Sequence, residues 1–131
     1  MERVVNDPHA MHIDATILPL KHGLLVYNPL RASEEALRKH AVLRDWDIRP
    51  YPFVPQKRDD PPLFMTSEWL CMNVLSISEN KVIIEEKDHE LADWVKQFGI
   101  EAIPLPFQHV HAIGGSFHCA TVDLVRDDIG I

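Results

Sequence analysis

The sequence predicts an α/β fold built from ββαβ repeat units, about two complete units followed by the first strand of a third. Three observations support this prediction. The two halves of the 131-residue chain show the same order of apolar segments, turns and helix signals. Each half ends in a proline–aromatic pair, Pro52-Phe53 and Pro106-Phe107. A glycine pair, Gly114-Gly115, then precedes another apolar segment. Such self-similarity is the sequence signature of a repeat architecture.

The first unit is expected over approximately residues 10–53. It should open with a strand over 12–20 (HIDATILPL) and, after a turn, continue with a short strand over 24–28. Ser33 should cap a helix, because two glutamates follow it in the first turn, where the helix dipole favours negative charge. Residues 47–53 should be extended, since each proline disfavours helix at the residue before it.

The second unit is expected over approximately residues 70–107. Strands are predicted at 72–78 and 81–86, and an extended segment at 101–107. Between them lies a helix that Gly99 should end, because glycine readily adopts the left-handed conformation after a helix. Its apolar face has helical spacing and consists of Leu91, Trp94, Val95 and Phe98.

The third unit is expected over approximately residues 114–131, with its first strand at 116–124 (SFHCATVDL). By length the chain should form one domain over 1–131. His12, Asn73 and Cys119 each lie near the start of an expected first strand. If the units pack around a common axis, these three residues should converge at one end of it.

The composition is that of an ordinary globular domain, with 46% hydrophobic and 25% charged residues. The net charge of −7 argues against a nucleic acid or an anionic membrane as partner. No apolar run approaches the ~20 residues that span a bilayer. Polar residues interrupt the N-terminus, so no secretory signal is recognised. We therefore expect a cytoplasmic location and two free thiols.

Of the two cysteines, Cys119 is the candidate nucleophile, because it follows Gly114-Gly115 and stands directly after His118. Paired glycines allow the backbone to approach a ligand closely. An imidazolium nearby can lower a thiol pKa, and we expect His12 and the local backbone to do so here. The alternative is a buried structural cysteine, which is the interpretation we favour for Cys71.

His12 and Asp14 would share one face of a strand, which suits proton transfer and the binding of a cationic group. The alternative is an ordinary polar strand edge. The chain has eight histidines, and His109-x-His111 also would share a face. Zinc sites usually show tighter paired spacings, so we expect no metal site.

Three segments together resemble the glycine and inosamine-phosphate amidinotransferases. Residues 7–16 (DPHAMHIDAT) resemble the stretch around the catalytic histidine of that family. Residues 65–75 (MTSEWLCMNVL) resemble its next block, and residues 114–121 (GGSFHCAT) resemble its nucleophile motif. The segments occur in the family's order. Beyond the nucleophile the sequence departs from the family, with Ala120-Thr121-Val122 after the cysteine.

The resemblance implies the pentein fold, in which five ββαβ units surround a pseudo-fivefold axis. By that measure the chain represents the C-terminal catalytic portion of such an enzyme. The expected partners of the polypeptide itself are a second copy of the chain or a missing N-terminal portion. The family's missing portion carries a carboxylate that orients the catalytic histidine, so we expect little turnover from the chain alone.

The resemblance also assigns roles to individual residues. Cys119 resembles the nucleophile and His12 the general acid–base. Asp14 resembles a carboxylate that holds the guanidinium, and Arg31 an arginine that binds the carboxylate of the donor. The remaining expected contacts to substrate are Ser67, Met11 and His9.

The implied reaction moves the amidino group of arginine to an acceptor amine, glycine or an inosamine-type amine, through a covalent amidino-cysteine. It needs no cofactor, and its partners are small molecules. Two alternatives remain. One is a guanidine hydrolase of the same fold, similar to arginine deiminase. The other is a truncated, non-catalytic remnant or interaction module.

Overall fold

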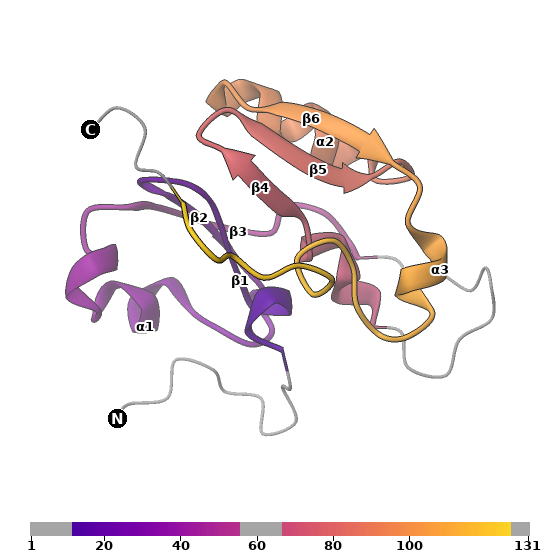
Figure 1. Ribbon diagram of the computed structural model, residues 1–131. Helices are drawn as coiled ribbons and strands as arrows, with labels where there is room; N and C mark the ends of the chain where they lie inside the picture. Colours follow the sequence, from indigo (N-terminus) through magenta and orange to yellow (C-terminus); the bar gives the residue numbers. More distant parts are fainter. Residues whose placement is uncertain (1–11, 56–66, 127–131) are drawn as a thin grey trace.

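The computed structural model describes residues 12–55 and 67–126, so the expected substrate contacts His9 and Met11 lie outside the described residues. Two three-stranded sheets, each accompanied by a helix, lie next to each other (Figure 1). Their first strands, β1 (Ile17–Lys21) and β4 (Leu75–Ser78), contact each other across the junction. The mixed α/β class predicted from the sequence is therefore observed.

The first sheet has the order β1-β2-β3. Strand β1 pairs antiparallel with β2 (Leu24–Tyr27), and β2 pairs parallel with β3 (Asp47–Pro50). The connection to β3 contains α1 (Glu34–Arg38) and a 3₁₀ turn at Ala41–Leu43. As expected, the Ser33 hydroxyl caps α1 by accepting the N–H of Ala36 at 3.2 Å.

The second sheet repeats this arrangement in the order β4-β5-β6. Strand β5 (Lys81–Glu85) pairs antiparallel with β4 and parallel with β6 (Glu101–Leu105). Helix α2 (His89–Val95) and a 3₁₀ turn at Lys96–Phe98 make the crossover. Gly99 ends it with a φ of 71°, the left-handed conformation expected for this glycine.

Both sheets also carry a register irregularity at the end of the first strand. It falls between Pro19 and Lys21 in one sheet and between Ser76 and Ser78 in the other. A bulge at this point increases the local twist of the hairpin. The two sheets thus share topology and a local detail that the sequence did not predict.

One hydrophobic core joins the two sheets. Leu91 and Val95 pack the apolar face of α2 onto the second sheet, and Leu20 and Leu24 enter the same core from the first sheet. Burial of each such side chain stabilises the fold by roughly 1.5–3 kcal/mol. A smaller core lies beneath α1 and consists of Leu25, Tyr27, Ala32, Leu37 and Ile48.

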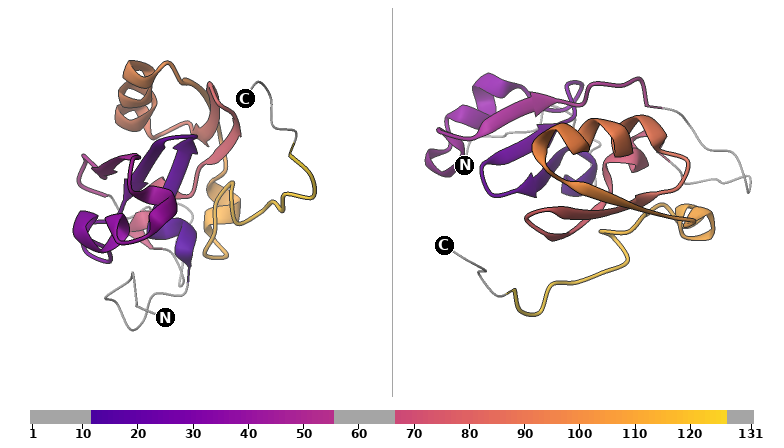
Figure 2. Two further views of the ribbon diagram at one scale, coloured as in Figure 1. Left: turned by 90° about the vertical axis from the view of Figure 1, so that its left-hand side faces the viewer. Right: turned by 90° about the horizontal axis from the view of Figure 1, so that it is seen from above.

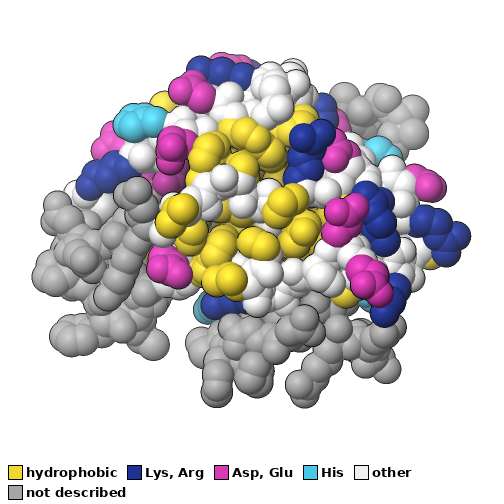
Figure 3. Space-filling model, turned by 180° about the vertical axis from the view of Figure 1, so that it is seen from behind, with side chains coloured by type: hydrophobic (Ala, Val, Ile, Leu, Met, Phe, Trp, Pro, Cys, Tyr) yellow, Lys and Arg dark blue, Asp and Glu magenta, His cyan; other side chains and the backbone are white. Residues whose placement is uncertain are grey.

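Polar contacts reinforce the junction between the units. The Lys21 ammonium donates to the carbonyl of Phe98 at 2.6 Å, and the backbone N–H of His22 donates to the Glu79 carboxylate at 3.2 Å. Two further views show the units from the side and from above (Figure 2). On the face opposite to that of Figure 1, hydrophobic side chains gather in the centre and charged side chains surround them (Figure 3).

The predicted boundaries of the first strands need correction. Residues 13–15 form a 3₁₀ turn, and strand β1 starts only at Ile17, so His12 does not open a strand. In the second unit a 3₁₀ helix at Glu68–Met72 replaces the start of the predicted strand 72–78. In each unit, short-range turn bonds bring the chain into the sheet later than its apolar pattern suggests.

The predicted strand over 116–124 is wrong. Within 67–126 the chain forms a short helix α3 (Gln108–His111) and then turns through 117–120 without pairing to a sheet. A strand needs a neighbour for its backbone groups. Here Ala120 bonds back to Ser116, and the N–H of His118 bonds to the carbonyl of Asn73. The third unit is therefore not represented by a strand in the described residues.

None of the helices that the structure describes has the length and apolar character required to cross a bilayer.

Candidate functional site

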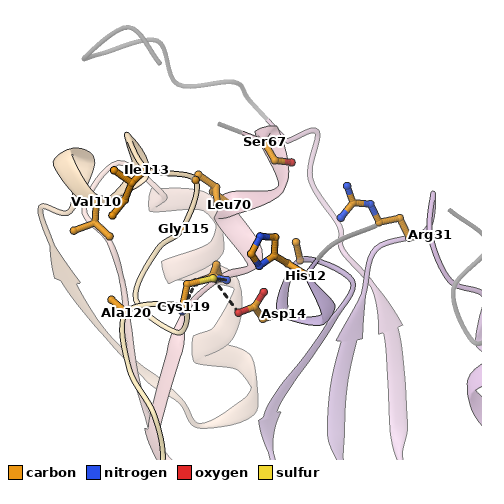
Figure 4. Close-up of a pocket in the computed structure, with 13 residues that line it drawn as sticks. His12, Asp14, Arg31, Ser67, Leu70, Val110, Ile113, Gly115, Cys119 and Ala120 are labelled. Atoms are coloured by element: carbon orange, nitrogen blue, oxygen red, sulfur yellow. Dashed lines mark hydrogen bonds between the residues drawn. The ribbon is translucent and has the colours of Figure 1, made fainter. Parts of the chain in front are cut away.

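A cavity of about 420 Å³ lies where the two units meet the segment after α3 (Figure 4). The 3₁₀ turn at Ile13–Ala15 and the 3₁₀ helix at Glu68–Met72 contact each other beside it. Each of the five described candidate site residues lines this cavity: His12, Asp14, Arg31, Ser67 and Cys119. Residues from three separate parts of the chain thus meet in one site.

The centre of the cavity holds three different reactive groups. The Cys119 thiol donates a hydrogen bond to Oδ2 of Asp14 at 3.1 Å. The imidazole of His12 completes the group, with one polar atom from each residue lying within 4.8 Å of the others. His12 occupies the position before the 3₁₀ turn and Asp14 lies within it, so the two residues reach the cavity from a turn and not from a strand face.

Asn73 holds the cysteine in place. Its side-chain oxygen accepts the backbone N–H of Cys119 at 3.0 Å, and its Nδ2 donates to the Cys119 Sγ at 3.0 Å. Asn73 is buried, and it follows the 3₁₀ helix that Ser67 caps through the N–H of Trp69. This two-point contact fixes both the backbone and the sulfur of Cys119.

The glycine pair before the cysteine has a steric reason. Gly114 adopts a φ of 89°, which is strained for other residues. A Cβ atom at Gly115 would lie 2.8 Å from the Cβ of Cys119. Real Cβ atoms essentially never approach so closely. Any side chain at Gly115 would therefore displace Cys119.

His118 contributes to the site through Asp14. Its Nδ1 lies 2.9 Å from Oδ2 of Asp14, the same oxygen that accepts the Cys119 thiol. The His118 ring is half exposed at the edge of the site. Asp14 therefore connects the histidine and the thiol that are adjacent in the sequence.

The electrostatics of the cysteine differ from expectation. Burial raises the pKa of the Cys119 thiol, and the Asp14 carboxylate raises it further by accepting the thiol proton and by its negative charge. The hydrogen bond from Asn73 acts in the opposite direction but is weaker. The prediction of a lowered thiol pKa is therefore wrong for the site as described, because the sulfur is partly buried and bonded to a carboxylate.

The acid responds in the opposite sense. Burial by itself would raise the pKa of Asp14, but hydrogen bonds from His118, Cys119 and Asn73 outweigh it and hold the pKa below its usual range. Asp14 is thus ionised at neutral pH while Cys119 remains a thiol. The site presents a negative charge to the cavity, which suits a cationic group.

Arg31 and Ser67 stand farther out. Arg31 is the last residue of a turn, in which its N–H donates to the carbonyl of Asn28 at 3.1 Å, and it is partly buried. In Figure 4 the arginine is drawn well apart from Cys119, with His12 between them. Ser67 lies at another edge of the cavity. A positive group thus stands away from the negative centre.

Buried contacts support the loop that carries the cysteine. His111 Nε2 lies 2.9 Å from the Ser116 hydroxyl, and Phe107 and Phe117 stack with ring centroids 4.1 Å apart. Glu85, which is buried, accepts the N–H of Phe107 at 2.8 Å. These contacts attach the loop to the end of strand β5.

The sequence identified residues that line the cavity, but it did not identify every residue that holds them in position. The convergence expected for His12, Asn73 and Cys119 is observed, although Asn73 was not expected to bond the cysteine at two points. The glycine pair was expected to let the backbone approach a ligand, whereas the close contact of Gly115 with Cys119 and the bond of His118 to Asp14 were not predicted. Position next to the candidate nucleophile was the available signal for both. Cys71 is buried, as expected for a structural cysteine.

The chain is similar to known amidinotransferases over most of its length. It is 42% identical over 123 residues to the L-arginine:L-lysine amidinotransferase of Pseudomonas savastanoi pv. phaseolicola. The aligned region covers 92% of this chain and 32% of that protein. It is 37% identical over 121 residues to the mitochondrial glycine amidinotransferase of Gallus gallus. Here the aligned region covers 92% of this chain and 28% of that protein. No family model matches the sequence.

Solved structures give the same result. An amidinotransferase from Microseira wollei in the saxitoxin biosynthetic pathway superposes with a TM-score of 0.78 at 35% identity, covering 93% of this chain and 35% of that one. The inosamine-phosphate amidinotransferase of Streptomyces griseus superposes with a TM-score of 0.77 at 28% identity, covering 98% and 35%. By sequence and by fold, this chain is a relative of the amidinotransferases and spans about a third of their length.

Proposed function

We propose that this chain carries the nucleophile, the acid–base group and part of the substrate pocket for amidino transfer from arginine to an acceptor amine. One observation supports this most directly: the five described residues that resemble the family's site residues line a single cavity. The names of the relatives support the same type of reaction.

The negative centre of the cavity suits the guanidinium of arginine. Asp14, held ionised by its hydrogen bonds, would pair with the guanidinium and orient it toward the sulfur. Arg31, on the far side of His12, would pair with the carboxylate of the same arginine. Both charged side chains line the same cavity, as a substrate with its positive and negative groups at opposite ends would require.

The guanidinium would also change the state of the nucleophile. In the free site, burial and then the Asp14 carboxylate raise the pKa of Cys119, and both therefore favour the protonated thiol. A bound cation would offset the negative charge of Asp14 and stabilise the thiolate, because an opposite charge nearby favours the charged form of an acid. Activation of the thiol would then depend on the substrate, and the free cysteine would be protected from stray electrophiles.

The first half-reaction would form a bond between Sγ of Cys119 and the guanidino carbon of arginine. The thiol proton of Cys119 would pass to His12 as this bond forms. The bond from that carbon to the side-chain nitrogen would then break, His12 would donate the same proton to this nitrogen, and ornithine would leave. In the second half-reaction the acceptor amine would attack the same carbon, His12 would take its proton, and the carbon–sulfur bond would break. Covalent catalysis divides one difficult displacement into two easier steps.

Capture of the covalent intermediate tests this proposal. The chain is incubated with arginine and no acceptor, and intact and digested protein are analysed by mass spectrometry. We expect one amidino group on Cys119 together with one equivalent of ornithine. The assay needs only one turnover per molecule. This suits a chain that spans about a third of its relatives' length, because the carboxylate expected to orient the histidine belongs to the family's other portion. Loss of an orienting carboxylate in a serine-protease triad lowers turnover on the order of 10⁴-fold.

The same assay separates the alternatives. A guanidine hydrolase of the deiminase type would release ammonia and citrulline and would retain the ornithine part on the cysteine adduct. A non-catalytic module would give no adduct with the wild-type chain, and the reaction would match that of a Cys119→Ser variant. Ornithine release that requires Cys119 and continues only when an amine is added would support the transfer.

A further inference from the structure

We propose that the three central side chains of the cavity, His12, Asp14 and Cys119, form a binding site for a thiophilic divalent cation of the Zn²⁺ class, and that the cation excludes a guanidinium. The three potential ligand atoms are a ring nitrogen, a carboxylate oxygen and a sulfur, and they lie within 4.8 Å of one another. The proposed binding of the cation depends only on these three residues. The proposed competition between the cation and a guanidinium rests on the proposed function.

The geometry is close to that of an open zinc site. Zinc binds sulfur at about 2.3 Å and nitrogen or oxygen at about 2.0–2.2 Å, so neighbouring ligand atoms in a tetrahedral site lie roughly 3–4 Å apart. Sγ of Cys119 and Oδ2 of Asp14 are already 3.1 Å apart. The exposed side chain of His12 would close the remaining gap by rotating about its own torsions. Because the three groups line an open cavity, a water molecule would take the fourth position.

The charge of the site favours a cation for a second reason. Oδ1 of Asp14 is buried and has no hydrogen-bond partner among the described residues. A buried carboxylate oxygen without a partner is costly, and a bound cation offsets that cost. A guanidinium would serve the same purpose, and therefore one charge attracts both ligands to the same place.

The ligand set selects the metal. A thiolate and an imidazole suit Zn²⁺, whereas Mg²⁺ and Ca²⁺ prefer sites made only of oxygens. Binding would convert the Cys119 thiol to a metal-bound thiolate and release its proton to solvent, so each bound cation should release about one proton. From the spacing of residues in the sequence we expected no metal site. That expectation missed this group because Cys119 lies 105 positions from Asp14.

The site is tested on the full chain with Co²⁺ and Zn²⁺ as probes. Added Co²⁺ should give a thiolate-to-cobalt charge-transfer band in the near ultraviolet, saturating at one equivalent, and Zn²⁺ should displace it. Cys119→Ser should abolish the band. His12→Ala and Asp14→Asn should each weaken Zn²⁺ binding on the order of 100-fold, since even losing an outer partner of a ligand costs about 10- to 100-fold. Mg²⁺ should neither give nor displace a signal.

Two controls make the result decisive. His89→Ala removes an exposed histidine at the start of α2, outside the cavity, and should bind Zn²⁺ as the wild type does. Zn²⁺ should also protect Cys119 from alkylation, which reports on the site even where a variant folds poorly. A charge-transfer band that persists in Cys119→Ser, or equal Zn²⁺ affinity in wild type and His12→Ala, would overturn the site.

Competition is measured separately. Arginine should raise the apparent dissociation constant for Zn²⁺ in proportion to its concentration. If Zn²⁺ binds at Cys119 while bound arginine leaves its affinity unchanged, the exclusion is wrong and the metal site stands. If arginine neither binds nor forms an adduct with metal-free protein, the proposed function fails, and the cobalt spectrum still decides the metal site.

Discussion

The thiol of Cys119 and the carboxylate of Asp14 share a hydrogen bond of 3.1 Å across 105 positions of the sequence. The bond joins the turn before the first sheet to the loop after the second unit. It also contributes to the protonation of both groups. Burial and this bond raise the pKa of the thiol, and hydrogen bonds from His118 and from the thiol lower the pKa of the carboxyl group. The resting site is therefore poised to receive a cation.

Asp14→Asn should lower the pKa of the Cys119 thiol. The substitution removes the negative charge that opposes the thiolate. Because only the thiolate reacts, the wild-type alkylation rate should keep rising above the pKa of an ordinary cysteine, whereas the variant should reach its plateau at lower pH. The measurement is iodoacetamide alkylation across pH with mass-spectrometric readout. Asp45→Asn, an exposed change outside the cavity, should leave the profile unchanged. An identical profile for Asp14→Asn would count against Asp14 as the controlling group.

Gly115→Ala should displace the nucleophile without unfolding the chain. The added Cβ would lie 2.8 Å from the Cβ of Cys119, so the loop must shift. We expect loss of the cysteine–amidino adduct, with far-UV circular dichroism retained. The matched control is Gly99→Ala, which has open space around its Cβ but a positive φ. That variant should lose roughly 1–2 kcal/mol of stability, because a Cβ is unfavourable in the left-handed conformation, and it should keep the adduct. Equal adduct yields in the two variants would contradict the steric argument.

Asn73→Ala should affect both stability and the cysteine. It leaves the N–H of Cys119 without its acceptor and the sulfur without a donor. Loss of a buried hydrogen-bond partner costs about 1–3 kcal/mol, and urea unfolding should show a decrease of that size. Because the Asn73 hydrogen bond favours the thiolate, the pKa of Cys119 should rise further. Asn80→Ala, in the exposed turn between β4 and β5, should leave the alkylation profile of Cys119 unchanged.

Arg31→Ala should weaken arginine binding more than it affects the thiol. Loss of a hydrogen-bonded ion pair to the substrate carboxylate corresponds to about 10- to 100-fold in affinity. Calorimetry with arginine and with agmatine, which lacks the carboxylate, separates this effect from general disruption. The wild type should prefer arginine, and the variant should bind both equally. If Arg31→Ala still prefers arginine to agmatine, Arg31 does not bind the carboxylate of the substrate.

The repeated order of strands and helix was predictable because each element has a signal within its own short stretch of sequence. In each unit an apolar hairpin precedes a capped or glycine-ended helix, and the helix face at Leu91 and Val95 packs as its spacing predicts. Local patterns of this kind need no knowledge of distant residues. The strand over 116–124 failed for the opposite reason. Its residues favour strand, but strand formation depends on a partner, and the segment bonds to itself and to Asn73 instead.

The candidate site was predicted as a set of residues rather than as a geometry. Short motifs around His12 and Cys119 were sufficient to place both residues in one cavity. The direction of the thiol pKa shift was not predictable, because it depends on how deeply the sulfur is buried and on how far Asp14 lies from it. Both quantities follow from packing between units and are absent from any single segment.

The arrangement of the two sheets has a consequence for the order in which the molecule assembles. Within each unit, paired strands are close in sequence, and short loops close rapidly. The contact between Asp14 and Cys119 instead closes a loop that encompasses both units. Sheets and helices can therefore form while the reactive centre is still open. Thiol reactivity during refolding should reach its native value only after the far-UV signal has recovered, which makes Cys119 a reporter for the last stage of folding.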